Sequence, residues 1–183
     1  MTHTRTKEKA FLSTRKSAVS LLILTLALVS SCGYKFAGQE TKLPDPIKTI
    51  AVAVFVNDTK EPNLELAVTG AITEKFQHDG RLAVVSAQKA DSLLSGTIEK
   101  YSLEPLVYDA YNNAAKYRVR IKVKIKFEDK VGQGLLVEKA LDVQWDYLVG
   151  PSVVYAELAR QEAVNQAASY LGDKMIGLLL EGF

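Results

Sequence analysis

The chain contains very few of the residue types from which catalytic and metal centres are built. Its 183 residues include one cysteine, Cys32, and two histidines, His3 and His78. A lone cysteine has no disulfide partner within the chain, so a disulfide scaffold is excluded. The sequence also has no glycine-rich phosphate loop and no G-x-S-x-G nucleophile motif. We therefore expect no catalytic residues, no metal site and no bound cofactor, and we interpret the protein as not being an enzyme.

Two remaining groups of side chains could be given a chemical role. His78 ends the helical segment Lys75-Phe76-Gln77-His78 and has no second metal ligand at a useful spacing, so we interpret it as part of a helix end. The acids Asp91, Glu99 and Glu104 leave a carboxylate pair open as an alternative. Acids scattered along strands are usually solvated, and they are the weaker candidates.

The first 31 residues have the organisation of a secretory signal peptide. Five basic residues and one acid precede residue 17, and residues 17–31 carry no charge. This uncharged run is 15 residues long. A helix that crosses a bilayer needs about 20, so a permanent membrane span is the weaker interpretation. The run ends in the sequence Val29-Ser30-Ser31-Cys32, which resembles the lipobox of bacterial lipoproteins.

We predict that the chain is cleaved before Cys32 and that this cysteine carries lipids. Diacylglycerol would be attached to its thiol and an acyl chain, such as palmitate, to the new amino terminus. Two or three chains hold a protein durably in a membrane, because each buried CH₂ contributes about 0.8 kcal/mol. The alternative is an ordinary signal peptide with a chance cysteine nearby. Gly33 is not the Asp associated with inner-membrane retention, which favours the periplasmic side of the outer membrane.

Cleavage changes the net charge of the protein. The precursor has 23 basic and 21 acidic residues, and loss of five basic residues and one acid leaves 18 and 20, a net charge of −2. The basic precursor is therefore no argument for binding nucleic acid. Residues 32–46 mix Gly, Pro and polar residues and read as a lipidated tether. Residues 47–183 have a suitable size for a single domain.

Hydrophobic periodicity predicts the first elements of this domain. Residues 47–56 form an apolar, β-branched run typical of a buried strand. A helix follows from Pro62 and ends at Asp79-Gly80, with an apolar stripe at spacings of three and four. Gly80 suits a left-handed helix cap. Residues 81–86 and 92–104 predict two further strands.

Residues 116–127 alternate strictly between two kinds of side chain. The even positions are all Lys or Arg and the odd positions are all apolar or aromatic, which indicates a long strand with one cationic and one apolar face. Residues 135–147 return after a glycine turn, with three acids at even positions. If paired residue numbers add to 264, Lys126 lies opposite Glu138, Lys122 opposite Asp142 and Arg118 opposite Asp146. Opposite charges then favour this register.

The last segment, residues 152–180, predicts a long helix capped by Ser152. Two helices and about four strands, in a mostly antiparallel or mixed sheet, predict an α+β fold. We expect a two-layer sandwich with both helices on one face of the sheet.

Several short motifs, taken in order, resemble the lipopolysaccharide-assembly lipoprotein family, LptE. They are Cys32-Gly33-Tyr34, Leu43-Pro44 before Ile47, Phe55 with Asn57 and Thr59, Pro62 with Leu64-Glu65, and Ala90-Asp91 before Leu94, Gly96 and Ile98, followed by the basic strand. The resemblance implies a two-layer sandwich that acts in the outer membrane as a plug of a large β-barrel partner, LptD. It also implies that the pair moves lipopolysaccharide to the outer leaflet.

The cationic strand has two interpretations. Its candidate contacts with the phosphates of lipopolysaccharide are Arg118, Arg120, Lys122 and Lys124. Alternatively it is the solvated face of an amphipathic strand. Because the returning strand offers three acids against six bases, we expect Arg120, Lys124 and one end of the strand to stay uncompensated.

Two other functions remain open. The protein could be a lipoprotein adaptor of another envelope secretion or barrel-assembly complex. It could also be a periplasmic enzyme or a carrier of a small ligand, although the sequence has no polar cluster that would line such a pocket.

Overall fold

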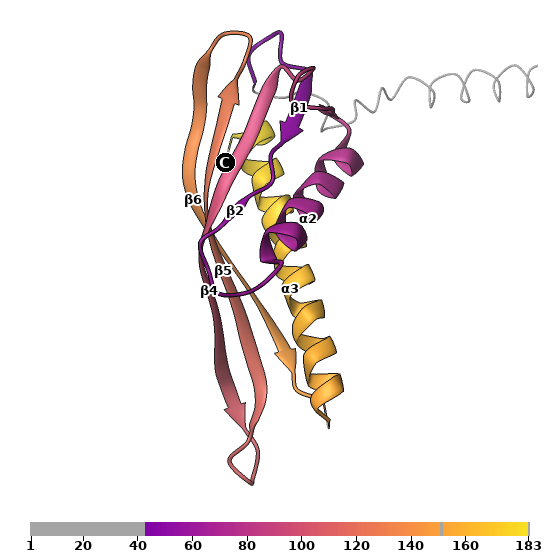
Figure 1. Cartoon of the computed structure of the whole chain (residues 1–183), viewed down its shortest axis with the longest axis vertical. Coiled ribbons are helices and arrows are strands. Elements are labelled where there is room, and N and C mark those ends of the chain that lie inside the picture. Colours follow the sequence, from indigo (N-terminus) through magenta and orange to yellow (C-terminus); the bar gives the residue numbers. More distant parts are fainter. Residues whose placement is uncertain (1–42, 151, 183) are drawn as a thin grey trace, which may run out of the picture. The chain divides into compact units, whose positions relative to one another are not determined.

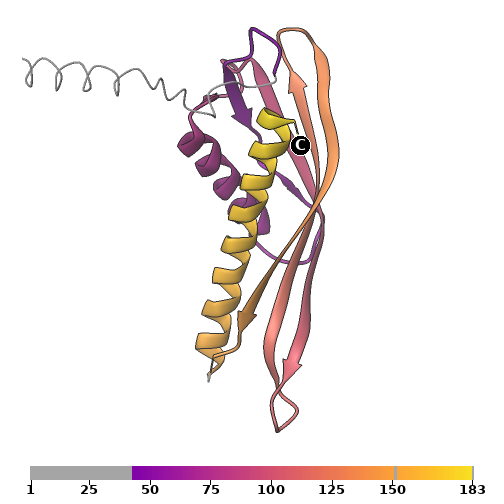
Figure 2. The same ribbon diagram turned by 180° about the vertical axis from the view of Figure 1, so that it is seen from behind.

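The computed structural model describes residues 43–150 and 152–182. Six strands, two α-helices and a terminal π-helical turn follow one another in the chain. They are β1 (Thr49–Val52), β2 (Val56–Asn57), α2 (Leu64–Asp79), β3 (Ala83–Val84), β4 (Ser92–Tyr108), β5 (Ala114–Asp129), β6 (Gly134–Leu148), α3 (Val153–Ile176) and η1 (Gly177–Glu181). Both helices lie on the same side of the sheet (Figures 1 and 2). The α+β two-layer class predicted from the sequence is confirmed.

The sheet is mixed, with the strand order β3-β1-β4-β5-β6, and β2 pairs with β4 beyond the end of β1. The short strands β1, β2 and β3 run parallel to their neighbours, and β4, β5 and β6 form an antiparallel meander. There are six strands where about four were expected. The run at residues 47–56 forms two strands instead of one, and β2 and β3 are each only two residues long.

The strand expected at residues 47–56 is divided into β1 and β2. Between them Phe55 turns into the core, with 2% of its surface exposed, while Val54 and Val56 face solvent. The backbone N–H of Phe55 donates to Thr69 Oγ1 of α2 instead of to a strand. The Phe55 ring lies over Gly96 of β4, where a Cβ would stand 2.3 Å from the ring. The chain therefore leaves the ladder in order to bury one aromatic ring.

The strand expected at residues 81–86 is shortened to β3, and Arg81 in front of it forms ion pairs. The Arg81 guanidinium binds Asp79 and also reaches Glu181 of η1, at 3.1 Å. This side chain ties the end of α2 to the end of the described chain. The cap predicted at Gly80 is confirmed, because this residue has φ 72° and its N–H donates to Phe76 O.

The register predicted for β5 and β6 is confirmed. Arg118 lies opposite Asp146, Lys122 opposite Asp142 and Lys126 opposite Glu138. From Val119 to Phe127 the apolar face of β5 is completely buried and packs under the helices, through Val119, Ile121, Val123, Ile125 and Phe127. The helices contribute the stripes Leu64, Val68, Ile72 and Phe76 from α2, and Ala163, Val164, Ala167, Ala168, Leu171 and Met175 from α3.

The ends of the long elements differ slightly from expectation. Strand β4 continues to Tyr108 and β5 begins at Ala114, so their hairpin is longer than the sequence indicated. Asp109 closes its loop by accepting hydrogen bonds from the backbone N–H groups of Tyr111 and Asn113. Ser152 caps α3 as predicted, with its side chain accepting from Tyr155 N. The last turn of the predicted helix is the π-helical η1.

Candidate functional site

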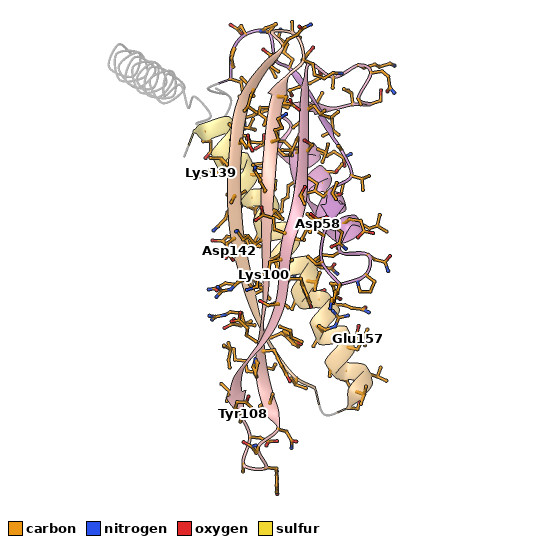
Figure 3. All side chains as sticks on the ribbon, turned by 60° about the vertical axis from the view of Figure 1, so that its left-hand side comes forward. Asp58, Lys100, Tyr108, Lys139, Asp142 and Glu157 are labelled. Carbon is orange, nitrogen blue, oxygen red and sulfur yellow. The ribbon has the colours of Figure 1, made fainter. Side chains whose placement is uncertain are left out.

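One face of the sheet is left uncovered by both helices, and we call it the open face. It carries the six cations of β5 in the centre, at Lys116, Arg118, Arg120, Lys122, Lys124 and Lys126. Side chains of β4 and β6 flank them, among them Lys100 and Asp142, which Figure 3 labels. The alternation of β5 produces this face, because its apolar residues are drawn to the helices and its cations must point the other way.

Each of the six cations has a carboxylate within 4.0 Å. The ion pairs are Lys116–Asp146 at 3.1 Å, Arg118–Asp146 at 2.7 Å, Arg120–Glu104 at 4.0 Å, Lys122–Glu99 at 3.1 Å, Lys124–Glu138 at 2.6 Å and Lys126–Glu128 at 2.8 Å. The open face is therefore a ladder of alternating charges across three strands, and not a block of positive charge.

The expectation of uncompensated cations was wrong for Lys124, which pairs with Glu138. Glu138 lies opposite Lys126 in the register but pairs with Lys124, while Lys126 pairs with Glu128. Lys116 pairs with Asp146, so neither end of the strand stays uncompensated. The expectation also counted only acids of the returning strand, whereas β4 supplies Glu99 to Lys122 and Glu104 to Arg120. Glu99 reaches this face because it is the extra residue of a β-bulge between Ile98 and Lys100. The predicted opposition of Lys122 and Asp142 exists between backbones, but the Lys122 ammonium turns to Glu99.

Two of these ion pairs shift the pKa values of their groups in the direction that favours the charged forms. The Arg118 guanidinium donates two hydrogen bonds to Asp146, at 2.7 and 3.1 Å, and lowers the pKa of Asp146 to about 2. The hydrogen bond between Lys124 and Glu138 raises the pKa of Lys124 and lowers that of Glu138. In these two pairs, Arg118–Asp146 and Lys124–Glu138, both groups are thus charged throughout the neutral pH range.

Arg120 has the weakest partners of the row. Its Nη2 donates to Gln144 Oε1 at 3.4 Å, and Glu104 stands 4.0 Å from its Nε. This Nε is buried and has no hydrogen-bond partner among the described residues. A guanidinium has five N–H donors, so Arg120 keeps donors for an incoming anion near the middle of the face. Of the four candidate contacts, Arg120 has the most distant carboxylate partner, while the side chains of Lys122 and Lys124 are more exposed.

A second distinctive surface is the distal pole, which we define as residues 103–117, 145–150 and 152–158. The β4–β5 hairpin there extends past the start of α3 (Figures 1 and 2). Of the 17 large hydrophobic side chains that are exposed in the described chain, 11 belong to this pole, namely Leu103, Leu106, Val107, Tyr108, Tyr111, Trp145, Leu148, Val153, Val154, Tyr155 and Leu158. Such a concentration is typical of an interaction surface.

A groove of about 620 Å³ runs through the distal pole. Its apolar lining includes Leu103, Tyr108, Tyr117, Tyr147 and Val153, and the Tyr117 and Tyr147 rings are stacked at 5.9 Å. Arg160 also lines it and binds Glu61, Glu157 and the Tyr101 hydroxyl, which joins α3 to β4 and to the loop before α2. The sequence alone does not reveal the distal pole, because its Tyr, Leu and Val residues are spread over several elements.

Several of the motif residues that suggested a family have structural roles in the described part of the chain. Asn57 donates to Glu61 O and Glu65 Oε2 and accepts from Thr59, which shapes the entry to α2. Asp91 accepts from Thr49 N and Thr49 Oγ1, and so locks β1 to the start of β4. The hydrogen bond from Thr49 lowers the pKa of Asp91. Asp91 therefore has a structural role and is no candidate acid.

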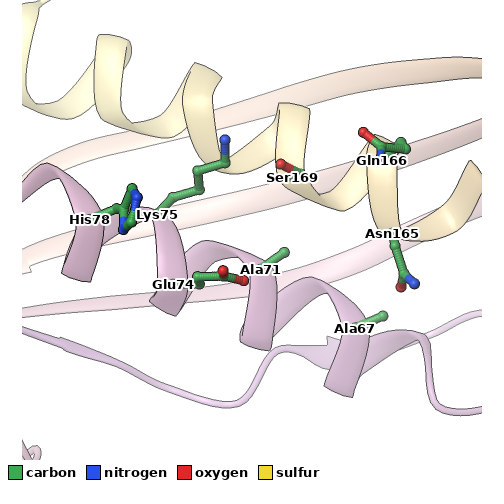
Figure 4. Close-up of a pocket in the computed structure, with 8 residues that line it drawn as sticks. All are labelled: Ala67, Ala71, Glu74, Lys75, His78, Asn165, Gln166 and Ser169. Atoms are coloured by element: carbon green, nitrogen blue, oxygen red, sulfur yellow. The ribbon is translucent and has the colours of Figure 1, made fainter. Parts of the chain in front are cut away.

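The outer surface of the helix layer has a polar groove of about 530 Å³ between α2 and α3 (Figure 4). Small residues such as Ala67, Ala71 and Ser169 leave it open, and His78 lies at its edge. In residues 43–150 and 152–182, no three His, Cys, Asp or Glu side chains gather as a metal site would require. The same ranges contain no helix that is long and apolar enough to cross a membrane. Cys32 and the predicted signal peptide lie outside the described residues.

These features define a two-layer α+β sandwich with an open, charged sheet face and an apolar pole. Residues 47–176 match the model of the LptE family, described as lipopolysaccharide-assembly, and the chain belongs to that family. The family resemblance seen in the sequence is thereby confirmed, and the chain's family acts in lipopolysaccharide assembly.

Solved structures of similar fold have little sequence in common with the chain. An uncharacterized lipoprotein B from Nitrosomonas europaea has a TM-score of 0.51 at 10% identity, over 76% of this chain and 83% of that one. The rare lipoprotein B from Shewanella oneidensis has a TM-score of 0.47 at 14% identity, over 69% and 90%. No curated protein matches the sequence significantly. At these identities the likeness concerns the fold alone.

Proposed function

We propose that this protein is an outer-membrane lipoprotein that binds lipopolysaccharide and plugs or assists a large β-barrel partner of the LptD type. Membership of the family supports this function in outline. The observation that supports binding of lipopolysaccharide is the open face, an uncovered sheet surface with six cations in one row. The protein works by contact and performs no chemical step.

Phosphate groups of lipid A and the inner core are the proposed ligands of the open face. Arg118, Arg120, Lys122 and Lys124 lie on one strand and present guanidinium and ammonium groups, which form strong hydrogen bonds to phosphate. Because these cations already have carboxylate partners, a phosphate must replace or share those partners. Arg120 is the proposed first contact, since its nearest carboxylate is 4.0 Å away.

The distal pole is the proposed contact with the barrel partner. Protein interfaces are enriched in Tyr and Trp and depleted of charge at their centres. The pole has Tyr108, Tyr111, Tyr155 and Trp145 exposed, together with aliphatic side chains. The lipids proposed for Cys32 would keep the protein at the periplasmic side of the outer membrane, near such a barrel.

Charge reversal on the open face tests the ligand. In the variant Arg120→Glu with Lys124→Glu, the affinity for purified lipopolysaccharide in detergent should fall about tenfold, because charge-assisted hydrogen bonds are lost. Arg120→Gln should cause a smaller loss. The control Lys139→Glu removes an exposed cation from the helix side of β6 and should bind normally. Unchanged binding by the double variant, with a native circular dichroism spectrum, would show that the row is only scaffolding.

Pull-down from detergent-solubilised membranes tests the partner. The wild-type protein should co-purify with one very large barrel protein. Tyr108→Asp should lose it, whereas Val131→Asp, on the turn between β5 and β6, should keep it. The two side chains are matched, since each has 55% of its surface exposed. Co-purification of secretion or barrel-assembly components instead would identify the adaptor function as correct.

Mass spectrometry of the native protein tests the anchor. We expect a chain that begins at Cys32 and carries the mass of diacylglycerol and an acyl chain. Cys32→Ala should leave the precursor uncleaved by the lipoprotein route and remove the protein from the outer membrane. An unmodified thiol at Cys32 in the wild type would overturn the proposed anchoring.

A further inference from the structure

Strand β6 is the edge of the sheet, and its outer side has no neighbouring strand in the described chain. One backbone hydrogen bond shows which residues of β6 direct their N–H and C=O groups toward β5. Val149 N donates to Ala115 O at 3.0 Å, so residues with odd numbers on this side of the meander bond to β5. Alternate residues of an antiparallel strand point the other way. The N–H and C=O groups that face outward are therefore those of Glu138, Ala140, Asp142, Gln144, Asp146 and Leu148.

The two faces of this edge differ in chemistry. On the open face, β6 presents the acids Glu138, Asp142 and Asp146, which are spaced four residues apart. Asp142 has no ion pair within the described residues, so one charge of this row is uncompensated. On the helix side, Trp145 is 40% exposed, and Val137, Leu141 and Tyr147 are half-buried, because α3 does not reach over the edge.

We propose that the β6 edge binds an extended segment of another protein by strand addition, and that this segment alternates basic and apolar residues. Its basic residues would lie beside Glu138, Asp142 and Asp146, where cross-strand pairs of opposite charge are favourable. Its apolar residues would cover Trp145, Leu141 and Val137. The backbone hydrogen bonds supply the binding energy and the alternating side chains select the segment. This inference is independent of the ligand proposed for the open face.

A second copy of the chain is a poor occupant of the same edge. Two antiparallel β6 strands would bring their rows of acids together, directly opposite or on the diagonal, in every register that pairs outward residues. Like charges at these positions are destabilising. The charge pattern thus selects a basic partner segment over self-association.

Lys174 of α3 occupies a hydrogen-bonding position in the middle of the β6 edge. Its Nζ lies 5.2 Å from the centre of the Tyr170 ring and donates to the Asp142 carbonyl oxygen at 3.3 Å. That carbonyl is one of the outward groups, so an added strand must displace the ammonium. Lysines beside an exposed edge are a known means of preventing unwanted pairing. Removal of Lys174 should therefore strengthen binding of the added strand.

The test uses the mature chain and a synthetic peptide with the sequence of residues 116–127, KYRVRIKVKIKF, as the basic and apolar probe. A control peptide has Glu at every Lys and Arg position. Hydrogen exchange measured by NMR should show new protection at the amides of Ala140, Asp142, Gln144 and Asp146 with the basic peptide only. If the basic peptide changes only the NMR signals of side chains on the open face, and exchange at these backbone amides stays unchanged, the proposal is wrong.

Three variants sharpen the result. Ala140→Pro removes one outward N–H that β5 does not use and should weaken the basic peptide about tenfold, whereas Ala140→Val should not. Asp142→Lys should weaken it about threefold and improve binding of the acidic peptide. Lys174→Ala should strengthen binding of the basic peptide. If Ala140→Pro folds normally and binds with wild-type affinity, or if Lys174→Ala binds more weakly, strand addition at this edge is wrong.

Discussion

The two ends of the sandwich use the same three strands in opposite ways. Under the helices, β5 places Val119, Ile121, Val123, Ile125 and Phe127 at 0% exposure. At the distal pole the same sheet carries exposed Tyr, Trp, Leu and Val side chains over which no described element lies. The covered end supplies the stability of the fold, since burial of apolar surface drives folding. The distal pole adds little to stability and is available for contact with a partner.

The largest expected effect comes from emptying the covered end. Phe127→Ala should lower the free energy of unfolding by about 3–5 kcal/mol, because a fully buried ring is replaced by a cavity. The comparison is Tyr111→Ala at the distal pole, where the ring is 86% exposed and the change should stay within about 0.5 kcal/mol. Urea unfolding followed by circular dichroism measures both. Equal losses of unfolding free energy in the two variants would show that the two ends contribute equally to stability.

A smaller effect is expected where β4 passes under Phe55. Gly96→Ala adds a Cβ that would stand 2.3 Å from the ring and 2.9 Å from Lys124 O. Overpacking of this kind should cost about 1–3 kcal/mol in unfolding free energy. Gly134→Ala is the control, because nothing lies within 4 Å of its added Cβ. Equal melting temperatures of the two variants would show that the Phe55 ring moves freely aside.

The pH dependence of stability tests the boundary between the ends, where Arg118 binds Asp146. The pKa of Asp146 is lowered from 3.8 in the unfolded chain to about 2 in the fold. A depressed carboxyl pKa stabilises the fold above the unfolded pKa, and this contribution is lost as the pH falls from about 4 to about 2. Asp146→Asn should flatten that part of the stability curve. A curve of unchanged shape would show that the ion pair does not contribute.

The smallest effect on stability is expected at the start of α3. Leu158→Gln changes an exposed side chain of the distal pole, and the unfolding midpoint should stay close to that of the wild type. Its recovery of the barrel partner in a pull-down should nevertheless fall. The two measurements together separate contact from folding. A destabilised Leu158→Gln protein that keeps its partner would contradict both assignments.

Local patterns predicted the middle of this molecule well. Strict alternation from Lys116 to Phe127, with acids spaced along the returning strand, was enough to obtain the β5–β6 register. Gly80 and Ser152 were correctly identified as caps, because capping depends on one or two residues. Both are interactions between neighbours along the chain or across a single strand pair.

Features that depend on a third element were missed. The run from residue 47 to 56 is apolar throughout, so nothing in it marks the point where Phe55 leaves the ladder for Gly96. The partners of Lys122 and Arg120 come from β4, and the position of Glu99 depends on a bulge that alternation does not reveal. The distal pole arises because β4 and β5 are longer than the helix above them, which is a relation between elements far apart in sequence.

The charge ladder has a consequence for selectivity. An anion that binds the open face exchanges one negative partner for another, so a single charge gains little over the carboxylate that it displaces. A molecule with several phosphates at fixed separations can replace many partners along one strand at once. Its advantage grows with every rung, as in multivalent binding. The near-neutral surface would thus discriminate by the number and spacing of phosphates, and common phospholipids with one phosphate would be passed over.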